Sequence, residues 1–308
     1  MSKQCASHLM MVRPASFQFN AETAVSNAFQ KKPEVLSPAQ INRKALEEFD
    51  NYVARLRANQ IKVLVIEDTP EPPKPDAIFP NNWISMHRSG LICLYPMCTP
   101  NRRREIRKDI LKTLKQYFIV KDIKDISGYS KDNLFLEGTG SIIFDKINKV
   151  AYACLSPRTD ADLFNVHCHT LGYEPVSFSS YDRNGTLVYH TNVMLTIGDG
   201  FAVICLKSIK NLSERKFVKD KLKSTGHEVI DISFEQMNAF AGNMLQVENT
   251  AGKPFLVLSE TAYNSLTHQQ ISKIEKYTSL LPVAIPTIET IGGGSARCMI
   301  AEIFLNEK

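Results

Sequence analysis

Apolar and polar positions alternate along the chain in a pattern that recurs several times. Each copy has a short apolar strand, a tight polar turn, a second apolar strand and then the apolar spacing of an amphipathic helix. The first strands begin at residues 83, 141, 192 and 243, and the apolar run after Cys298 begins a fifth copy. The copies follow one another at about 50 residues, a period that predicts a repeat architecture.

The two strands of each copy are expected to form a hairpin. The turn at 198–200 reads Gly-Asp-Gly, for instance, and these residues favour tight turns. The predicted hairpins pair residues 83–86 with 91–97, 141–144 with 150–155, 192–197 with 201–206, and 243–247 with 255–258. Helices are predicted after Pro100 and over residues 160–171, 213–224 and 267–277.

Residues 8–13 form an apolar strand with no hairpin partner nearby. The last copy stops at Lys308, so we expect this strand to complete that copy. A helix opened by Ser37-Pro38 belongs to the same unit, because proline is favoured in the first helical turn. A strand over residues 62–66 follows this helix.

Strands that alternate with helices normally indicate a doubly wound parallel sheet. The hairpin in every copy, together with the period, favours instead a radial array of small sheets. Closure of the ring by residues 8–13 would remove exposed sheet edges. No break in composition divides the chain. We therefore predict a single α/β domain over residues 1–308, built as five ββαβ repeats.

The composition is that of a soluble protein. The 308 residues are 44% hydrophobic and 22% charged, with no apolar run of membrane-spanning length and no secretory signal at the N-terminus. The seven cysteines, an odd number without regular spacing, indicate free thiols in a reducing compartment. We expect a cytoplasmic protein.

The net charge of +5 is modest, and the densest basic run is Arg102-Arg103-Arg104 with Arg107 and Lys108. Apolar residues recur at 106, 110, 114 and 117, so a helix is expected with the arginines mainly on its solvated side. A nucleic-acid surface is the alternative, but no aromatic residues or known motif accompany the run. We expect neither a nucleic-acid nor a membrane partner.

Three consecutive glycines, Gly292-Gly293-Gly294, lie shortly before Cys298. Glycine permits backbone conformations and close approaches that a side chain prevents. The arrangement predicts a loop that presents a thiol at the mouth of a strand, which favours a nucleophile over a core cysteine. A thiolate nucleophile needs a base or an electropositive neighbour, most often histidine.

His190 opens one copy of the repeat at the place where Cys298 opens another. Equivalent positions in a ring converge on its axis, so the two side chains are expected to meet. A histidine that merely forms a hydrogen bond at a strand end is the alternative. The other openings are also polar, and together they would line one axial pocket with Asn82, Glu137, His190, Asn192, Asn243 and Cys298.

The His167-Cys168-His169 run contains three metal-ligating residue types. Ligands one residue apart seldom converge on one ion without distant partners. We therefore expect a surface helix here and predict no metal site.

These residues resemble the guanidino-group-modifying enzymes: arginine deiminases, dimethylargininases and amidinotransferases, which share the five-bladed α/β propeller called the pentein fold. In particular, the chain resembles the arginine deiminase-related citrulline utilisation hydrolases. The similarity covers nearly the whole chain and lies in the order and spacing of its motifs. The matching segments are residues 9–14, 75–82, Glu137-Gly138, 156–159, 190–192, Asn243 and the glycine-rich Cys298 loop.

The resemblance implies a role for each of these positions. It implies that Cys298 is the nucleophile, that His190 is the general acid and base, and that Glu137 binds substrate N–H groups. Asp76 and Phe79 match positions around the substrate. Arg158 matches a position that often holds a substrate carboxylate through a bidentate pair. The resemblance implies no cofactor and no metal.

Two positions depart from the arginine deiminase pattern. Those enzymes clamp the cationic guanidinium with acids where this chain has Asn82 and Asn192. A carboxylate only accepts hydrogen bonds, whereas an amide both donates and accepts. A neutral ureido group has N–H donors and a carbonyl acceptor, so the amides favour a ureido substrate. A guanidinium buried without those acids would be poorly compensated.

The resemblance and these two amides predict a cysteine hydrolase that converts citrulline to ornithine, carbon dioxide and ammonia through an S-carbamoyl cysteine. Arginine deiminase-like or amidinotransferase activity on arginine or a derivative is one alternative. A non-catalytic binding propeller is another. The expected partner is a small ureido or guanidino compound, and a homo-oligomer is left open.

Overall fold

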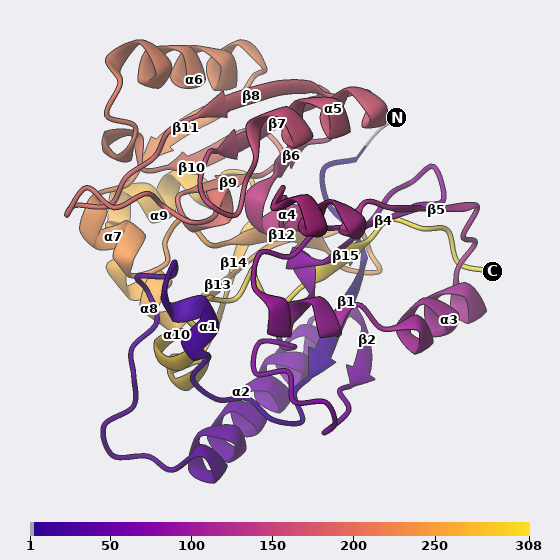
Figure 1. The fold of residues 1–308 in the computed structure, drawn as a ribbon. Helices are drawn as coiled ribbons and strands as arrows, with labels where there is room; N and C mark the ends of the chain where they lie inside the picture. Colours follow the sequence, from indigo (N-terminus) through magenta and orange to yellow (C-terminus); the bar gives the residue numbers. More distant parts are fainter. Residues whose placement is uncertain (1–2) are drawn as a thin grey trace.

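The computed structural model describes residues 3–308, and its strands group into five units of one topology (Figure 1). In each unit the first two strands run antiparallel, and the third lies parallel to the second. A parallel return needs a crossover connection, which helical segments supply here. The four predicted hairpins are confirmed, and a third strand pairs with the second strand of each.

Four units follow one another in the sequence. The first contains β3 (Ile84–Met86), β4 (Leu91–Leu94), α3 (Lys108–Tyr117) and β5 (Asp122–Asp125). The second contains β6 (Ile143–Asp145), β7 (Val150–Cys154), α5 (Ala161–Leu171) and β8 (Glu174–Phe178). The third contains β9 (Leu195–Ile197), β10 (Phe201–Ile204), α6 (Leu212–Ser224) and β11 (Glu228–Asp231). The fourth contains β12 (Leu245–Glu248), β13 (Pro254–Ser259), α8 (Glu260–Ser265), α9 (His268–Ile274) and β14 (Ser279–Val283).

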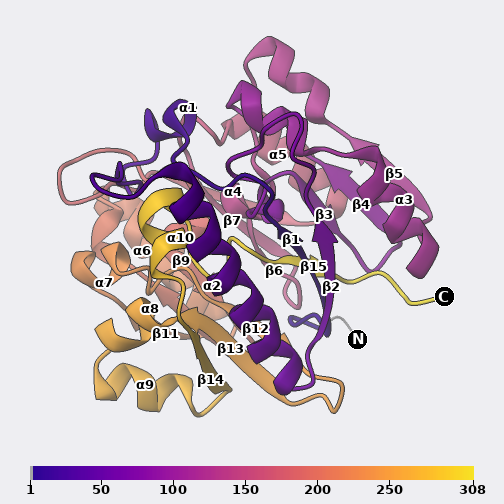
Figure 2. The same ribbon diagram turned by 90° about the horizontal axis from the view of Figure 1, so that it is seen from below.

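The fifth unit joins the two ends of the chain. β1 (His8–Arg13) pairs antiparallel with β15 (Ala301–Ile303) and parallel with β2 (Lys62–Glu67), which confirms that the first strand completes the last unit. Helix α2 (Pro38–Ala58) forms the crossover and lies beside these strands (Figure 2). It begins as expected, because Ser37 and Gln40 form a reciprocal capping box.

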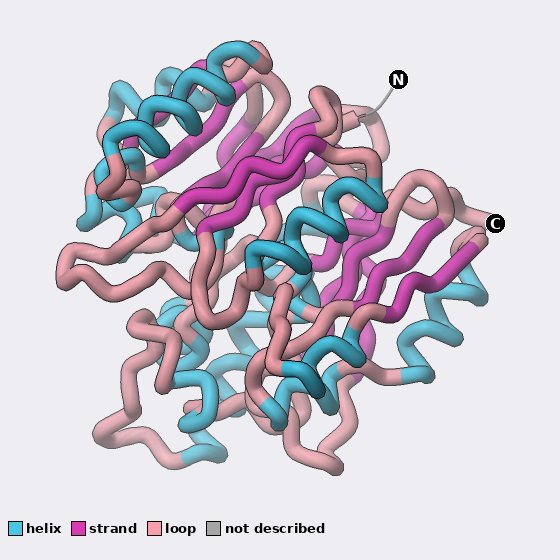
Figure 3. Tube along the Cα trace, turned by 45° about the horizontal axis from the view of Figure 1, so that its top comes forward, coloured by secondary structure: helices cyan, strands magenta, loops and turns pink. Residues whose placement is uncertain are grey.

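The five units make four hydrogen-bonded sheets. β15 also pairs with β3, so the fifth and first units share one six-stranded sheet of order β2-β1-β15-β3-β4-β5. The other three units are separate three-stranded sheets. The strands accordingly lie in separate groups flanked by helices (Figure 3). The fold is a mixed α/β architecture, and the doubly wound parallel sheet is excluded by these pairings.

Buried apolar side chains fill the spaces between the units. The largest cluster joins the second, third and fourth units, and another packs α2 against the fourth and fifth units and includes Cys298. Within residues 3–308, none of the helices has both the length and the apolar character needed to cross a membrane.

Three of the unit openings are short helical turns rather than strand residues. Residues Pro80–Asn82, α4 (Gly138–Ser141) and Thr191–Val193 form such turns, so the first strands begin later than predicted. Hydrogen bonds connect the opening residues of neighbouring units. Thr139 donates to the Asn81 carbonyl at 3.2 Å, and Asn243 Nδ2 donates to the Asn192 carbonyl at 2.8 Å.

Glycines let these openings approach closely. A Cβ on Gly138 would lie 2.4 Å from the Asn81 carbonyl oxygen, and one on Gly242 would lie 2.2 Å from the Val193 carbonyl oxygen. Real Cβ atoms do not approach oxygen so closely, so the neighbouring backbones would have to separate. The polar side chains of different units therefore meet because glycine stands at their contacts.

The basic run differs from its prediction. Residues Pro100–Glu105 form a 3₁₀ helix, and α3 starts only at Lys108. Arg102 is 3% exposed because its guanidinium forms two hydrogen bonds, each of 2.8 Å, with the buried Glu105 carboxylate. The expectation of solvated arginines was wrong for Arg102, and Tyr117, expected on the apolar face, is 52% exposed.

The predicted surface helix around His167 also differs. Helix α5 buries His167 and Cys168 and leaves His169 exposed. His167 Nε2 lies 3.1 Å from the Tyr95 hydroxyl, which accounts for a polar ring inside the apolar face of the helix.

Candidate active site

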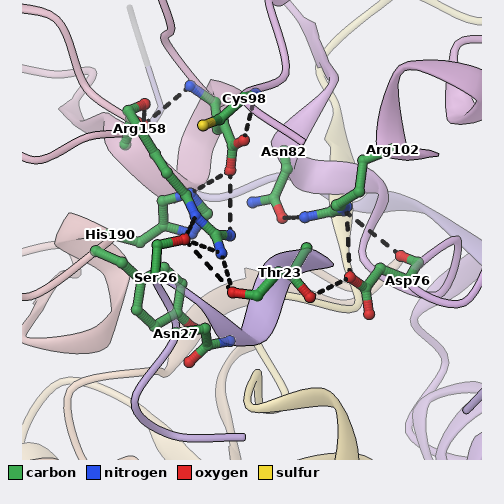
Figure 4. A network of polar contacts seen from close by, with 12 residues as sticks. Thr23, Ser26, Asn27, Asp76, Asn82, Cys98, Arg102, Arg158 and His190 are labelled. Atoms are coloured by element: carbon green, nitrogen blue, oxygen red, sulfur yellow. Dashed lines mark hydrogen bonds and ion pairs between the residues drawn. The ribbon is translucent and has the colours of Figure 1, made fainter. Parts of the chain in front are cut away.

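The unit openings contribute to the wall of a small pocket. It contains both Cys298 and His190, and its free volume of about 10 Å³ is roughly that of one water molecule. The segment around α1 (Ala21–Ala24) covers it, with Thr23 and Asn27 in the pocket wall (Figure 4). The lining residues are Thr23, Asn27, Asp76, Phe79, Asn82, Arg102, Arg158, Tyr189, His190, Gly292, Gly294 and Cys298.

Cys298 lies in a turn three residues before β15 begins at Ala301, and it is 3% exposed. Two amides converge on its sulfur: Asn192 Nδ2 and Asn243 Nδ2 each lie 3.2 Å from Sγ. Hydrogen bonds donated to sulfur favour its charged form. The two amides therefore present N–H donors to the Cys298 sulfur.

The orientation of the Asn243 amide follows from its other partners. Its Oδ1 accepts the Arg297 backbone N–H at 3.2 Å, so its Nδ2 is the atom turned toward the sulfur and the Asn192 carbonyl. The buried Arg297 guanidinium, 3.6 Å from Glu302, adds positive charge in the residue next to the cysteine. Burial lowers the pKa of Arg297, and Glu302 opposes that effect.

His190 pairs with Glu137 rather than with the cysteine. His190 Nε2 lies 2.7 Å from Glu137 Oε2, and the other carboxylate oxygen accepts the Cys98 backbone N–H at 2.9 Å. An ionised carboxylate only accepts hydrogen bonds, so Nε2 carries the hydrogen in this contact. The second ring nitrogen, Nδ1, is left to act on other groups.

The charge states of this pair follow from burial and from Arg158. Burial would raise the pKa of Glu137, but Arg158, 3.5 Å away, and the His190 hydrogen bond outweigh it and lower that pKa to about 2. Burial lowers the pKa of His190 to about 4 against the opposing effect of Glu137. At neutral pH the pair is a carboxylate and a neutral imidazole.

Arg158 connects this pair to the covering segment. Its guanidinium donates to Ser26 Oγ at 2.8 and 3.0 Å and to the Thr23 carbonyl at 2.9 Å (Figure 4). It also stacks over the Tyr189 ring, with 4.9 Å from Cζ to the ring centroid. In this closed arrangement the donors of Arg158 are occupied by protein groups.

Asp76 and Asn82 face each other across Arg102. Asp76 Oδ2 accepts hydrogen bonds from Asn20 at 2.7 Å and Thr23 at 3.1 Å, while its Oδ1 is buried without a partner among the described residues. Burial raises the pKa of Asp76, and Arg102 opposes this. The free Oδ1 is an acceptor available to a ligand N–H.

Arg102 fixes the orientation of the Asn82 amide. Its Nη1 donates to Asn82 Oδ1 at 2.7 Å (Figure 4), so the amide oxygen must point to the arginine and Nδ2 away from it. Within residues 3–308, neither Asn82 Nδ2 nor Asn192 Oδ1, both buried, has a hydrogen-bond partner. Buried polar groups are normally paired, so unpaired ones are candidate contacts for a ligand. Asn82 Nδ2 is a donor, and Asn192 Oδ1 and Asp76 Oδ1 are acceptors.

The glycine-rich loop packs on Phe79. A Cβ on Gly292 would lie 2.8 Å from the Phe79 ring, and one on Gly294 would lie 3.0 Å from it. Gly293 has φ +63° and ends α10 (Pro286–Gly292), and its carbonyl accepts the Tyr189 hydroxyl at 2.6 Å. The glycines are thus required for contact with Phe79 and for the helix end, which together bring the loop to the cysteine.

The structure brings the predicted site residues together in one region. Cys298, His190, Asp76, Phe79, Asn82 and Arg158 line the pocket, whereas Glu137, Asn192 and Asn243 are in direct contact with His190 or Cys298. Sequence reasoning missed Thr23, Asn27, Tyr189 and Arg102. For Arg102 one signal was available, its i,i+3 spacing from Glu105. Among residues 3–308, no group of three or more His, Cys, Asp or Glu side chains could hold a metal ion.

Several solved structures share this fold. The apo structure of ArgZ, an arginine dihydrolase from the ornithine-ammonia cycle in cyanobacteria, superposes with a TM-score of 0.74 at 14% identity over 96% of this chain. This chain spans only 40% of that protein's length. Its N-terminal domain, with bound product, matches over 97% of this chain and 98% of the domain, again with a TM-score of 0.74 and 14% identity.

A dimethylarginine dimethylaminohydrolase in an adduct with S-methyl-L-thiocitrulline has the same fold, with a TM-score of 0.65 and 15% identity over 98% of this chain and 99% of that chain. No curated protein matches the chain significantly. Residues 13–305 match the enzyme family described as N,N dimethylarginine dimethylhydrolase, eukaryotic. With nearly its whole length matched, the chain belongs to this family, and so to the guanidino-modifying pentein enzymes that its motifs resemble.

Proposed function

We propose that the protein is a cysteine hydrolase that converts citrulline to ornithine, carbon dioxide and ammonia. The observation that supports this substrate most is the Asn82 amide, whose oxygen is held by Arg102 at 2.7 Å and whose Nδ2 is left as an unpaired donor. A ureido carbonyl accepts such a hydrogen bond. A guanidinium has only N–H donors, so one of its N–H groups would lie against the Asn82 N–H with no acceptor between them.

The two free acceptors suit the N–H groups of either substrate class. Asp76 Oδ1 and Asn192 Oδ1 are buried without partners, and both a ureido and a guanidino group can donate to them. The buried arginines do not decide between the two classes, because Arg102, Arg158 and Arg297 lie against the carboxylates of Glu105, Glu137 and Glu302.

In the proposed mechanism, His190 Nδ1 takes the proton of the Cys298 thiol. The resulting imidazolium is stabilised by Glu137 at 2.7 Å, and the thiolate by the Asn192 and Asn243 amides. The sulfur attacks the ureido carbon, and Asn82 Nδ2 donates to the oxygen that becomes negative. His190 then protonates the ornithine nitrogen as its bond to carbon breaks, which leaves an S-carbamoyl cysteine.

Hydrolysis of that intermediate returns the site to its starting state. His190 Nδ1, neutral again, removes a proton from water as the oxygen attacks the carbamoyl carbon. The carbon–sulfur bond breaks, the proton returns to the cysteine, and carbamic acid leaves and decomposes to carbon dioxide and ammonia. No redox change or cofactor enters this sequence.

Admission of the substrate requires the covering segment to move. The closed pocket has a volume of only about 10 Å³, far below the volume of an amino acid. The segment is bound to Arg158 by hydrogen bonds from the guanidinium to the Thr23 carbonyl and to Ser26 Oγ. When the segment moves away, these bonds break and the guanidinium becomes available to a ligand. A substrate carboxylate that replaces them would give Arg158 the role implied by the resemblance.

Hydrolysis of arginine or a methylated arginine is the second candidate. It is favoured by the family that the chain matches, and the arginine dihydrolase and dimethylarginine enzymes share the fold. A non-catalytic binding protein is a third reading, and it requires no reactive thiol in the pocket.

Purified protein incubated with citrulline, arginine or dimethylarginine distinguishes these functions. We expect ornithine and ammonia from citrulline, no product from citrulline with Cys298→Ser, and normal turnover with Cys5→Ser, which removes a thiol elsewhere. A preference of the wild type for arginine would refute the ureido substrate, and activity in Cys298→Ser would refute the covalent mechanism.

We also infer that the five units form one closed five-bladed propeller and a single domain. Consecutive openings are linked by hydrogen bonds, from Asn243 to Asn192 and from Arg297 to Asn243, while β15 pairs with β3 across the remaining junction. These contacts support a ring of five units with the pocket on its axis.

A further inference from the structure

A second recess, separate from the catalytic pocket, is lined by basic residues. It has a volume of about 150 Å³ and lies where the hairpin turn between β3 and β4 meets the turn between β6 and β7. Among residues 3–308, no acidic side chain lines it. The lining residues are Lys3, His87, Arg88, Ser89, Lys146, Lys149, Leu171, Tyr173 and Phe304.

We propose that this recess binds a small dianion of the phosphate class, and that its occupancy is transmitted to Cys298 through Glu302. The evidence for the binding site is the charge of its lining side chains. Lys3 is paired with Glu248 and Lys146 with Glu302, whereas Arg88 and Lys149 have no ion-pair partner among the described residues. Two uncompensated cations at one recess match one dianion.

Two of the lysines are held in place before any ligand arrives. The Lys146 ammonium lies 4.7 Å from the centre of the Phe304 ring, and the Lys149 ammonium lies 4.7 Å from the centre of the Tyr173 ring. Cation–π contacts of this kind fix flexible side chains and reduce the entropy lost on binding. The recess therefore presents its charges in a fixed arrangement.

The turn that carries these lysines is itself rigid. Asp145 Oδ1 accepts the Asn148 backbone N–H at 2.9 Å, and the Lys146 N–H donates to Gln4 Oε1 at 2.8 Å. Lys149 has φ +59°, a left-handed conformation that is uncommon for a residue other than glycine. Both lysines therefore project from a backbone that is fixed by its own contacts.

The size of the recess limits the ligand. Pockets for drug-sized molecules measure about 300–1,000 Å³, and this one is about 150 Å³. It suits inorganic phosphate or the phosphate group of a small phosphomonoester, and it is too small to enclose a nucleotide. Free phosphate and a phosphomonoester share this chemistry and are separated by experiment.

Glu302 joins the recess to the residue beside Cys298. One of its carboxylate oxygens lies 3.2 Å from Lys146, and the other lies 3.6 Å from Arg297. A dianion that binds Lys146 competes with Glu302, which then pairs more fully with Arg297. This reduces the positive field at the Cys298 sulfur, and the thiolate becomes less favoured. This second part rests on the proposed nucleophile.

Titration of the protein with inorganic phosphate, and separately with methyl phosphate, tests the site by calorimetry at constant ionic strength. We expect saturable binding with a Kd near or below about 1 mM. Lys149→Met and Arg88→Met should weaken it at least about tenfold. Both residues are exposed, so the variants should fold, which thermal melting checks.

Lys253→Met is the matched control. It removes one charge from a lysine that also lies over an aromatic ring, Phe255 at 5.1 Å, but outside the recess. Unchanged binding in this variant supports the site. The absence of saturation at about 10 mM phosphate, or equal weakening by Lys253→Met, overturns it. Tighter binding of methyl phosphate than of phosphate identifies a phosphomonoester as the ligand.

The coupling is measured as the rate of Cys298 alkylation, without substrate turnover. Saturating phosphate should slow this rate by about fivefold in the wild type. It should have no effect on the rate in Glu302→Gln, which still binds phosphate. A rate that phosphate leaves unchanged in the wild type overturns the coupling. Failure of citrulline turnover bears only on the proposed function, since neither measurement uses it.

Discussion

The Glu137 carboxylate lies 2.7 Å from His190 Nε2 and thereby determines which ring nitrogen carries the hydrogen. Replacement by glutamine allows the amide NH₂ to donate to Nε2, which moves the ring hydrogen to Nδ1 and removes the base. We expect Glu137→Gln to lower kcat for citrulline by roughly 10²–10⁴-fold with little change in KM.

Steady-state kinetics of Glu137→Gln, with Glu174→Gln as the control, check this prediction. Glu174 is 54% exposed and pairs with Lys221 on the surface, so its variant loses a similar charge away from the pocket. Equal kcat values for wild type and Glu137→Gln would show that the carboxylate does not set the state of His190.

Asn82→Asp should change the substrate preference. A carboxylate at this position still pairs with Arg102, but it has no N–H to donate to a ureido oxygen and can accept from a guanidinium. We expect kcat/KM for citrulline to fall by about 10²-fold, the cost of one lost hydrogen bond to a developing charge, while the ratio of arginine to citrulline turnover rises. A lower ratio in the variant would contradict the role of this amide.

Much of this arrangement is encoded in local sequence, and the pattern identifies it. The hairpins, the helix behind Ser37 and the strand at residues 8–13 each have their own periodicity or cap, and they are found where expected. The convergence of Cys298, His190 and Asn82 follows from their equivalent places in the repeat. Local signals and the repeat period thus suffice for the framework and the centre of the site.

The missed features depend on contacts between distant parts of the chain. Arg102 is buried because Asn82 and Glu105 meet it, yet in the sequence it is one arginine in a basic run. The segment around Thr23 covers the pocket through Arg158, and its own sequence has no periodicity that marks a cover. Such partners are known only once the units are assembled.

Reaction with a small alkylating reagent should modify Cys298 selectively near neutral pH. Burial raises the pKa of Cys5 and Cys154 to about 12 and that of Cys93 to about 11, and burial also raises the pKa of Cys98. Thiols with raised pKa values react slowly because the thiolate is the nucleophile.

Asn243→Ala should slow the alkylation of Cys298 by about 10- to 100-fold, because one hydrogen bond to a charged sulfur is lost. Peptide mapping after timed quenching gives both the site and the rate. Modification spread over several cysteines, or a rate unaffected by Asn243→Ala, would exclude an activated thiol and favour the binding-protein alternative.

Acidification should destabilise the protein partly through His190. The pKa of this residue is about 4 in the folded state and 6.5 in its ordinary state, so between these values the unfolded chain binds a proton that the folded chain does not. Its contribution to stability is complete above pH 6.5 and is lost progressively down to pH 4. The low pKa of Glu137, about 2, adds a further loss below pH 4.5.

Urea unfolding of wild type and His190→Asn at several pH values measures this effect. The free energy of unfolding should fall less steeply between pH 6.5 and 4 in the variant, whereas the exposed His169→Asn should follow the wild type. Parallel curves for wild type and His190→Asn would mean that His190 does not remain neutral in the folded protein.

Gly140 separates the two site side chains whose chemistry is proposed to act together. A Cβ at this position would lie 2.4 Å from Asn82 Nδ2 and 2.7 Å from His190 Nδ1, although it would remove neither group. Gly140→Ala should therefore push both side chains aside while the protein still folds, with a stability loss of about 1–3 kcal/mol from overpacking. A displacement near 1 Å costs about 10²-fold in rate, so kcat/KM for citrulline should fall by that factor.

Gly128→Ala is the matched control, since its Cβ would meet no described atom within 4 Å and should leave the rate unchanged. Full activity in Gly140→Ala would show that Asn82 and His190 tolerate displacement, and the proposed contacts of Nδ2 and Nδ1 with the substrate would then be wrong.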